Sequence, residues 1–234
     1  MDEFKKKLAL SRNDKLNGLR AAVLGANDGV VSTAGLIFGV AGATNNKGAI
    51  FTAGLAGLIA GAISMAVGEY VSVSTQRDTE RAFIDREKEL LASDPKSQLE
   101  DLVSFYEQKG VSKKTALQFA RELSANDPVK AHLEAELKLD EEDLTNPLTA
   151  GIASFFSFGL GALIPLVAAV ASPDKTRIQI TLVAVVVGLF LTGYYSAKFG
   201  GANKRAAVLR VLVGGIAAMA VTYAVGRAFG TAIS

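Results

Sequence analysis

The stretch "AAVLGANDGVVSTAGLIFGVAGA", residues 21–43, decides the fold of this chain. It is long and apolar enough to cross a hydrocarbon core of about 30 Å as a helix, yet it contains one aspartate, Asp28. An ionised carboxylate in that position costs on the order of 3 kcal/mol or more unless something compensates for it. We therefore interpret Asp28 as a functional residue.

Four further windows of the same kind follow, and their only charge is Arg210; they cover residues 48–68, 146–171, 178–197 and 206–226. Five apolar helices leave too little polar surface to cover them in a soluble protein. The sequence therefore predicts an integral membrane protein of the all-α class. We expect five transmembrane helices and a cytosolic helical insert between the second and the third.

The distribution of basic residues predicts the orientation of the spans. Six of them precede the first span, at Lys5, Lys6, Lys7, Arg12, Lys15 and Arg20, whereas the loop "TNNKG" after it holds one lysine. The loop between spans four and five is again basic, with Lys198, Lys204 and Arg205. The positive-inside rule then puts the N-terminus and the insert in the cytosol and the C-terminus outside. No targeting segment is visible, which favours the cell membrane over the vacuolar membrane.

The chain divides into residues 1–71 with spans one and two, a polar insert at 72–145, and residues 146–234 with spans three to five. No Gly or Pro interrupts residues 69–92, so span two should leave the membrane as one continuous helix. Asp94-Pro95 and Asp127-Pro128 read as N-caps followed by Pro at the first helical position, and Ser112 can cap a helix after Gly110. Three short helices are expected, over residues 95–109, 113–124 and 128–142.

The insert is acidic, since it holds 17 of the 23 Asp and Glu residues against 11 Lys and Arg, a net charge of −6. A cation-collecting domain would account for this excess. A solvated helical surface with i,i+4 ion pairs would also account for it. Zero cysteines exclude disulfides and thiolate metal sites, and the overall net charge of +2 suggests no nucleic-acid partner.

Spans one and two each carry a stripe of small residues. The stripes consist of Gly25, Ser32, Gly35, Gly39 and Gly42 in the first and Gly54, Gly57, Gly61, Ser64 and Gly68 in the second. Such stripes let helices approach closely in lipid. Because they offer more packing surface than one subunit obviously requires, we expect a homodimer that forms through these two spans.

Met65 and Glu69 are i,i+4 on span two, with Glu69 at its cytosolic end. Met65 is a packing residue on one reading and a metal ligand on the other. A thioether beside a carboxylate shifts metal preference from Mg²⁺ and Ca²⁺ toward Fe²⁺ and other transition metals. A carboxylate in a low-dielectric path can also exchange a cation for a proton.

The segments "GANDGVVSTAGLIFGVAGA", "AGAISMAVGEYVSVSTQRD" and "GALIPL" resemble the first three spans of the vacuolar iron transporter family. The resemblance covers almost the whole chain. It implies a homodimer that moves Fe²⁺ or Mn²⁺ out of the cytosol in exchange for protons, along a path between the subunits. Asp28 and Met65 match the translocation-path ligands of that family, and Glu69 lies in its "GEY" segment. No permanent cofactor is implied, because the metal is the transported and regulatory ion.

The insert resembles the cytosolic metal-binding domain of the same family. Glu87 and Glu136 fall on glutamate positions and Asp101 replaces a third glutamate, with Glu89, Glu134 and His132 as further candidate ligands. His132 lies one turn before Glu136, a spacing that suits either a shared metal or a histidine without a role. The chain departs from the family pattern at five positions. Leu90 and Gln98 stand in place of glutamate, His132 and Leu133 stand where methionines can occur, and Gly57 occupies a position that is acidic in some members.

Two other functions compete with transport. Intramembrane proteolysis would need two aspartates or a Ser/His pair, but the spans hold one aspartate and no histidine, so we expect no enzyme and no catalytic residues. A membrane-anchored metal-binding or ferroxidase module is the second alternative. A mere anchor would need neither five spans nor a carboxylate within one of them, which favours transport.

Overall fold

The computed structural model describes the backbone of residues 2–137 and 146–233, and the side chains of residues 21–135 and 146–230. These residues are almost entirely helical and contain no strand. In chain order the elements are α1 (Asp2–Ala43), α2 (Lys47–Ser93), α3 (Pro95–Gln108), α4 (Lys113–Asn126), α5 (Pro128–His132), the π-helical turn η1 (Leu133–Leu137), α6 (Pro147–Ala171), α7 (Arg177–Gly200) and α8 (Lys204–Ile233). The predicted all-α class is confirmed.

Five helices are long and apolar enough to cross a membrane. The candidate spans lie in Ala21–Ala43, Lys47–Ser93, Pro147–Ala171, Arg177–Gly200 and Lys204–Gly230. Large apolar side chains point away from the helix packing in each of them; Leu160 and Val221, for example, are 67% and 63% exposed. Such surface would be a liability in water but is the expected lipid-facing surface of an integral membrane protein.

Contacts divide the chain into two units. One, which we call the membrane unit, comprises Met1–Val71 and Pro147–Ser234, and the other, the insert unit, comprises Ser72–Asn146. The boundary between Val71 and Ser72 falls inside α2, which runs without a break from Lys47 to Ser93. The continuous helix expected from the absence of Gly and Pro is therefore confirmed.

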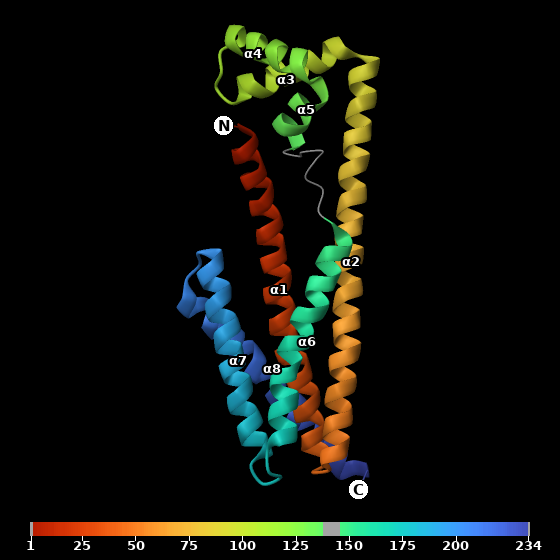
Figure 1. Ribbon diagram of the computed structural model, residues 1–234, viewed down its shortest axis with the longest axis vertical. Helices are drawn as coiled ribbons and strands as arrows, with labels where there is room; N and C mark the ends of the chain where they lie inside the picture. The colour runs from red at the N-terminus through yellow and green to blue at the C-terminus, as the bar shows by residue number, and fades with distance from the viewer. Residues whose placement is uncertain (1, 138–145, 234) are drawn as a thin grey trace. The chain divides into compact units, whose positions relative to one another are not determined.

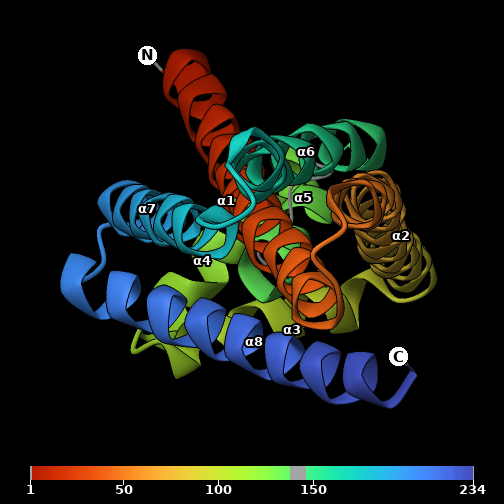
Figure 2. The ribbon, with the colours of Figure 1, turned by 90° about the horizontal axis from the view of Figure 1, so that it is seen from below.

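Within the membrane unit, α1 packs against α6, α7 and α8, and Figure 2 shows it in the middle of these helices. Its inner face contributes Val30, Ala34 and Phe38 to a core completed by residues of α7 and α8, namely Val185, Leu189 and Met219. A second cluster joins α1 to α2 and α6 through Ile37, Ile50 and Leu166. The fold thus positions α1, and Asp28 with it, against most of the other spans.

The glycines of span one lie in close contact with other helices of the same chain. A Cβ at Gly29 would overlap the Phe158 carbonyl oxygen of α6, and a Cβ at Gly226 of α8 would overlap the Gly39 carbonyl oxygen. A Cβ at Gly35 would lie 3.6 Å from the Thr222 methyl group. The stripe therefore permits close packing of α1 on α6 and α8. These neighbours belong to the same subunit, and the expected dimer through spans one and two stays a prediction.

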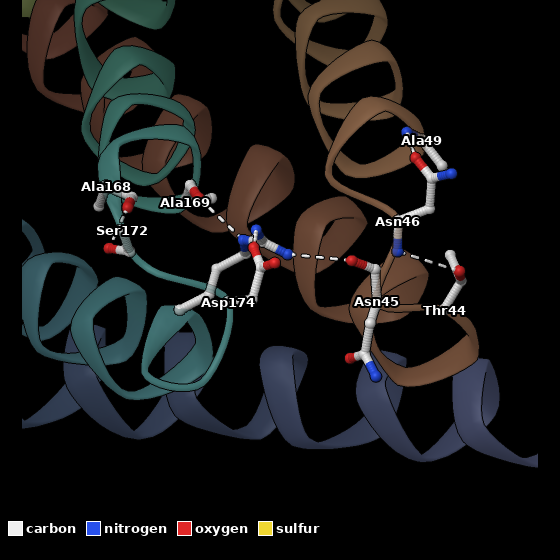
Figure 3. Close-up of polar contacts among 9 residues, drawn as sticks. Thr44, Asn45, Asn46, Ala49, Ala168, Ala169, Ser172 and Asp174 are labelled. Atoms are coloured by element: carbon white, nitrogen blue, oxygen red, sulfur yellow. Dashed lines mark hydrogen bonds and ion pairs between the residues drawn. The ribbon is translucent and has the colours of Figure 1, made fainter.

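A buried arginine ties two connections of the membrane unit together. The Arg177 side chain is 3% exposed; its Nε donates to the Ala169 carbonyl at 3.1 Å and its Nη1 donates to the Asn45 carbonyl at 3.2 Å. Its Nη2 also contacts the Asp174 carboxylate. Figure 3 shows how the α1–α2 and α6–α7 connections meet here, with Asn46 capping α2 by accepting from the Ala49 N–H at 3.0 Å. Carbonyls that a helix end leaves without partners are satisfied by this guanidinium.

The insert unit combines the end of α2 with α3, α4, α5 and η1, around a core that includes Leu102, Val103 and Ala116. The predicted caps are confirmed. Asp94 accepts from the Ser97 N–H at 3.1 Å, Ser112 from the Thr115 N–H at 3.4 Å and Asp127 from the Lys130 N–H at 3.0 Å. Gly110 ends its helix region with φ +91°, a conformation that favours glycine.

Two helix boundaries in the insert unit differ from the prediction. Helix α4 extends two residues beyond the expected end, to Asn126, because the Asp127 N–H bonds back to the Leu123 carbonyl. The single helix expected over 128–142 is instead a five-residue α5 followed by the π turn η1. Residues 138–145, the remainder of that prediction, lie outside the described part of the chain. The π turn begins directly after His132, and such turns are frequent at functional sites.

Candidate functional site

Asp28 lies on α1, half-buried, with a hydroxyl as its partner. The Ser32 Oγ donates to the Asp28 Oδ1 at 2.6 Å across one helical turn. Among the residues whose side chains are described, no cation pairs with this carboxylate. A hydrogen bond from a neutral hydroxyl orients an ionised carboxylate without compensating its charge.

Two contacts with α6 fix the backbone around Asp28. A Cβ at Gly25 would lie 3.2 Å from the Phe158 nitrogen, and a Cβ at Gly29 would overlap the Phe158 carbonyl oxygen. Glycine at both positions lets the α6 backbone approach α1 directly. The sequence thus places Asp28 between two points at which α1 contacts α6 closely, so the backbone that carries its side chain is held in place.

The face of α1 that carries Ser32 borders a groove of about 570 Å³ between α1 and α8. Its lining is Val31, Ser32, Gly35, Leu36, Gly39 and Val40 from α1 and Ala218, Thr222, Val225 and Gly226 from α8. The Thr222 hydroxyl already donates to the Ala218 carbonyl at 2.9 Å. The Ser32 hydroxyl therefore connects the groove with the Asp28 carboxylate.

Met65 and Asp28 approach the same turn of α6 from different helices. Met65, half-buried on α2, packs against a cluster made of Ala62, Phe158 and Ala162. Gly29, next to Asp28, lies against Phe158 and Ala162 as well. Glu69 is half-buried one turn beyond Met65 on α2. The three predicted translocation-path residues thus occupy α1 and α2 around α6, and their role as ligands stays a prediction.

In the insert unit, Glu87 and His132 are brought together. The His132 Nδ1 lies 3.2 Å from the Glu87 Oε1, and the two side chains are 1% and 10% exposed. They come from α2 and α5, which are far apart in the sequence. Carboxylate oxygen and imidazole nitrogen are both ligands of divalent transition metals, so this pair provides two of the donors that a metal site needs.

The other predicted ligands of the insert unit are not gathered around this pair. Glu89, Asp101 and Glu134 are exposed, and Glu134 lies 3.8 Å from the Lys130 Nζ as an i,i+4 pair. The Glu136 side chain lies outside the described residues. Within the described part of the chain, no group of three or more His, Asp or Glu side chains is close enough to hold a metal ion. The full ligand set therefore stays a prediction.

Sequence reasoning placed Ser32 in the small-residue stripe and missed its bond to Asp28. The signal was available, because a hydroxyl four residues after an aspartate on a helix lies within reach of the carboxylate. The proximity of His132 to Glu87 could not be read in the same way. It depends on the tertiary fold of the insert unit, whereas the sequence suggested a neighbour on the same helix, Glu136.

Five candidate spanning helices, with the Asp28 carboxylate in the first of them, indicate a multi-span integral membrane protein. The chain belongs to the VIT family, whose model matches residues 19–227. It is 41% identical over 210 residues to a vacuolar iron transporter of Acanthamoeba castellanii, covering 89% of this chain and 77% of that protein. It is 38% identical over 213 residues to vacuolar iron transporter homolog 1 of Oryza sativa subsp. japonica, covering 91% and 74% of the two chains. With vacuolar iron transporter homolog 2 of Arabidopsis thaliana it shares 33% identity over 231 residues, or 98% and 93% of the two chains.

Proposed function

We propose that this protein transports divalent transition metal, Fe²⁺ or Mn²⁺ or both, out of the cytosol in exchange for protons. The observation that carries the proposal is the Asp28 carboxylate in a spanning helix, with a neutral serine hydroxyl as its partner. An ionisable residue inside a membrane span marks an ion or proton path by default. The names of the relatives support iron as one substrate.

The geometry suggests how one carboxylate serves both ions. Ser32 holds Oδ1, which leaves Oδ2 of Asp28 to bind a metal ion while the carboxylate is ionised. When the metal leaves, the same oxygen takes up a proton, because an isolated charge in a low-dielectric span is costly. The next metal ion must displace that proton. Metal and proton therefore compete for one site, which is the minimum requirement for exchange.

Met65 and Glu69 extend this path along α2. The Met65 thioether is a soft donor that favours transition metals over Mg²⁺ and Ca²⁺. Glu69, at the predicted cytosolic end of the span, attracts cations toward the path. We expect both residues to act on metal delivery, with Asp28 as the residue that exchanges metal for proton.

The insert unit supplies metal from the cytosol and senses it. Its net negative charge raises the local concentration of cations, and Glu87 with His132 provides a buried pair of donors. Asp101 and Glu136 complete the proposed set, with Glu89 and Glu134 as helpers. Substituting alanine at Glu87, Asp101 and Glu136 together should lower the Mn²⁺ affinity of the full-length protein in calorimetry. An unchanged affinity would favour the solvated ion-pair surface.

We further propose that the protein works as a homodimer. Because the glycines of span one pack within the subunit, a leucine at Gly39 would test the fold and the dimer at once. The oligomeric state is better measured on the unmodified protein in nanodiscs. A monodisperse monomer there would contradict the proposal.

Flux measurements separate this function from the membrane-anchored metal-binding alternative. Purified protein in proteoliposomes is presented with Fe²⁺, Mn²⁺, Co²⁺ or Zn²⁺ while the internal pH is recorded. A transporter that exchanges metal for protons carries metal into the vesicle and protons out of it, so the internal pH rises. An anchored ferroxidase or storage module moves no metal across the membrane. Metal flux without a pH change would refute proton exchange and leave transport intact.

A further inference from the structure

We infer that the membrane unit binds an anionic phospholipid where α1, α7 and α8 meet, next to the α7–α8 connection. The phosphate is held by Lys198, Lys204 and Arg205, and an acyl chain enters a cavity bounded by Asn27, Thr192 and Ser196. This connection lies at the upper end of α7 in Figure 1, opposite the α6–α7 connection. The inference concerns a bilayer partner and is independent of the transported ion.

The first observation is an uncompensated basic cluster. Lys198 lies in the last turn of α7, Lys204 and Arg205 open α8, and all three side chains are exposed. No Asp or Glu occurs in the sequence after Asp174, so α7 and α8 contain no carboxylate of their own. No ion pair to these three residues forms within the described part of the chain. Basic residues beside a spanning helix attract anionic headgroups, by about 1 kcal/mol each near the membrane surface.

The second observation is the aromatic side chains that hold these cations at the helix ends. The Lys204 Nζ lies 5.2 Å from the centroid of the Tyr194 ring, and the Lys198 Nζ lies 6.0 Å from that of Tyr195. Phe199 is 57% exposed beside them. Tyrosines at the ends of spans sit at the headgroup level of a bilayer. The cluster is therefore placed at the depth of lipid phosphates.

The third observation is a cavity of about 380 Å³ that begins at the same level. Gly200, the last residue of α7, lines it together with Thr192 and Ser196 from the same helix face, while Leu24 and Val211 provide apolar wall from α1 and α8. Its volume lies in the range of roughly 300–1,000 Å³ that ligand sites occupy. A cavity that is mostly apolar and starts at a basic cluster fits one phospholipid chain with its headgroup outside.

One polar atom of the cavity wall has no partner among the described residues. The Asn27 Oδ1 is buried and accepts no hydrogen bond from any described residue. A buried amide oxygen without a donor is costly, so this part of the wall is not optimised for packing within the chain alone. The neighbouring cations would repel a metal ion, so the cavity is not a branch of the metal path.

The test is native mass spectrometry of the full-length protein, equilibrated in detergent with equal amounts of phosphatidylglycerol and phosphatidylcholine. The unmodified protein should retain phosphatidylglycerol preferentially. Replacing Lys204 and Arg205 with glutamine should reduce that preference about fivefold for each cation removed. The matched control replaces Lys47, the first residue of α2, and Lys175, in the α6–α7 connection, with glutamine. Both connections, α1–α2 and α6–α7, lie at the other end of the membrane unit (Figure 1), so the preference should be unchanged.

Two further arms test the cavity. Ser196→Phe should fill it and lower retention while all cations remain. Because that variant can also misfold, the unmodified protein is compared with long-chain and short-chain phosphatidylglycerol, and the short chain should bind more weakly. The inference is overturned if the Lys204 and Arg205 variant keeps its preference, if both chain lengths bind equally, or if inorganic phosphate displaces the lipid, since the site would then be an anion site on the surface.

Discussion

Two carboxylates, one in each unit, occupy opposite environments. Asp28 is half-buried in a spanning helix and accepts one hydrogen bond from a serine hydroxyl. Glu87 is buried in the insert unit, 3.2 Å from a histidine that can itself carry a positive charge. Among the described residues Asp28 has no countercharge, whereas Glu87 lies beside a histidine from another helix.

This difference separates function from stability. A carboxylate without a countercharge costs free energy in the empty state, and a cation or proton that binds it recovers that cost. A carboxylate in a buried pair holds two helices together, so a metal ion must share or displace the existing partner. Replacing each carboxylate by its amide should therefore damage transport at one site and folding at the other.

The largest effect is expected for Asp28→Asn. The amide keeps the shape and accepts the Ser32 hydrogen bond, so insertion and assembly should be normal. Transport of Fe²⁺ should fall by more than the roughly 10–100-fold loss seen when only a partner of a metal ligand is removed, since the ligand itself loses its charge. Flux per folded protein in proteoliposomes measures this. Flux at the level of the unmodified protein would sink the proposed mechanism.

Glu87→Gln should instead lower the free energy of unfolding of the insert unit, by about 1–3 kcal/mol, because His132 loses its charged partner in a buried site. Glu89→Gln is the matched control, two residues away and exposed, and should stay within about 0.5 kcal/mol. Thermal unfolding without metal tests both. Equal stability of the two variants would show that the buried pair contributes nothing.

The sequence predicted the membrane unit better than the insert unit. Spans are specified by length and hydropathy, which are local properties, so all five candidate spans were predicted. In the insert unit the equally local cap residues Asp94, Ser112 and Asp127 were predicted as well. The neighbours of the span-one glycines within the subunit could not be predicted. A stripe on a helix says that something packs closely there, but only the fold says that the neighbour of Gly39 is α8 of the same subunit.

The candidate ligands divide in the same way. Asp28 was identified because a charged residue within an apolar window can be recognised from the sequence alone. The sequence suggested that His132 shares a metal ion with Glu136 on the same helix. In the structure, the described neighbour of His132 is Glu87 on α2. That contact joins segments that are distant in the sequence, and α5 ends after His132 in a π turn, which no local pattern in the sequence indicates.

Met65→Leu sharpens the comparison inside the membrane unit. Leucine preserves apolar volume against Phe158 and Ala162, so folding should change by less than about 1.5 kcal/mol. The variant deletes the soft donor, and Fe²⁺ flux should fall about tenfold, less than for Asp28→Asn. If flux and stability fall together in proportion, Met65 is a packing residue only.

The smallest effect concerns the exposed acids of the insert unit. Burial raises the pKa of the Tyr106 phenol above its usual value of 10.0, and the Glu134 carboxylate raises that pKa further. A raised pKa means that folding favours the neutral phenol, so its stabilising contribution is present below pH 10 and is lost as the pH rises through the folded pKa. Glu134→Gln should lower the pKa of Tyr106, with the phenolate absorbance as the measurement. Tyr106→Phe identifies the part of the phenolate absorbance that comes from Tyr106. The control Glu89→Gln should leave the pKa of Tyr106 unchanged. If the titration of Tyr106 is unaltered in Glu134→Gln, the charge of the exposed Glu134 carboxylate is screened by water and by the Lys130 Nζ, 3.8 Å away. The difference in electrostatic effect between Glu134 and the buried Glu87 would then be larger than expected.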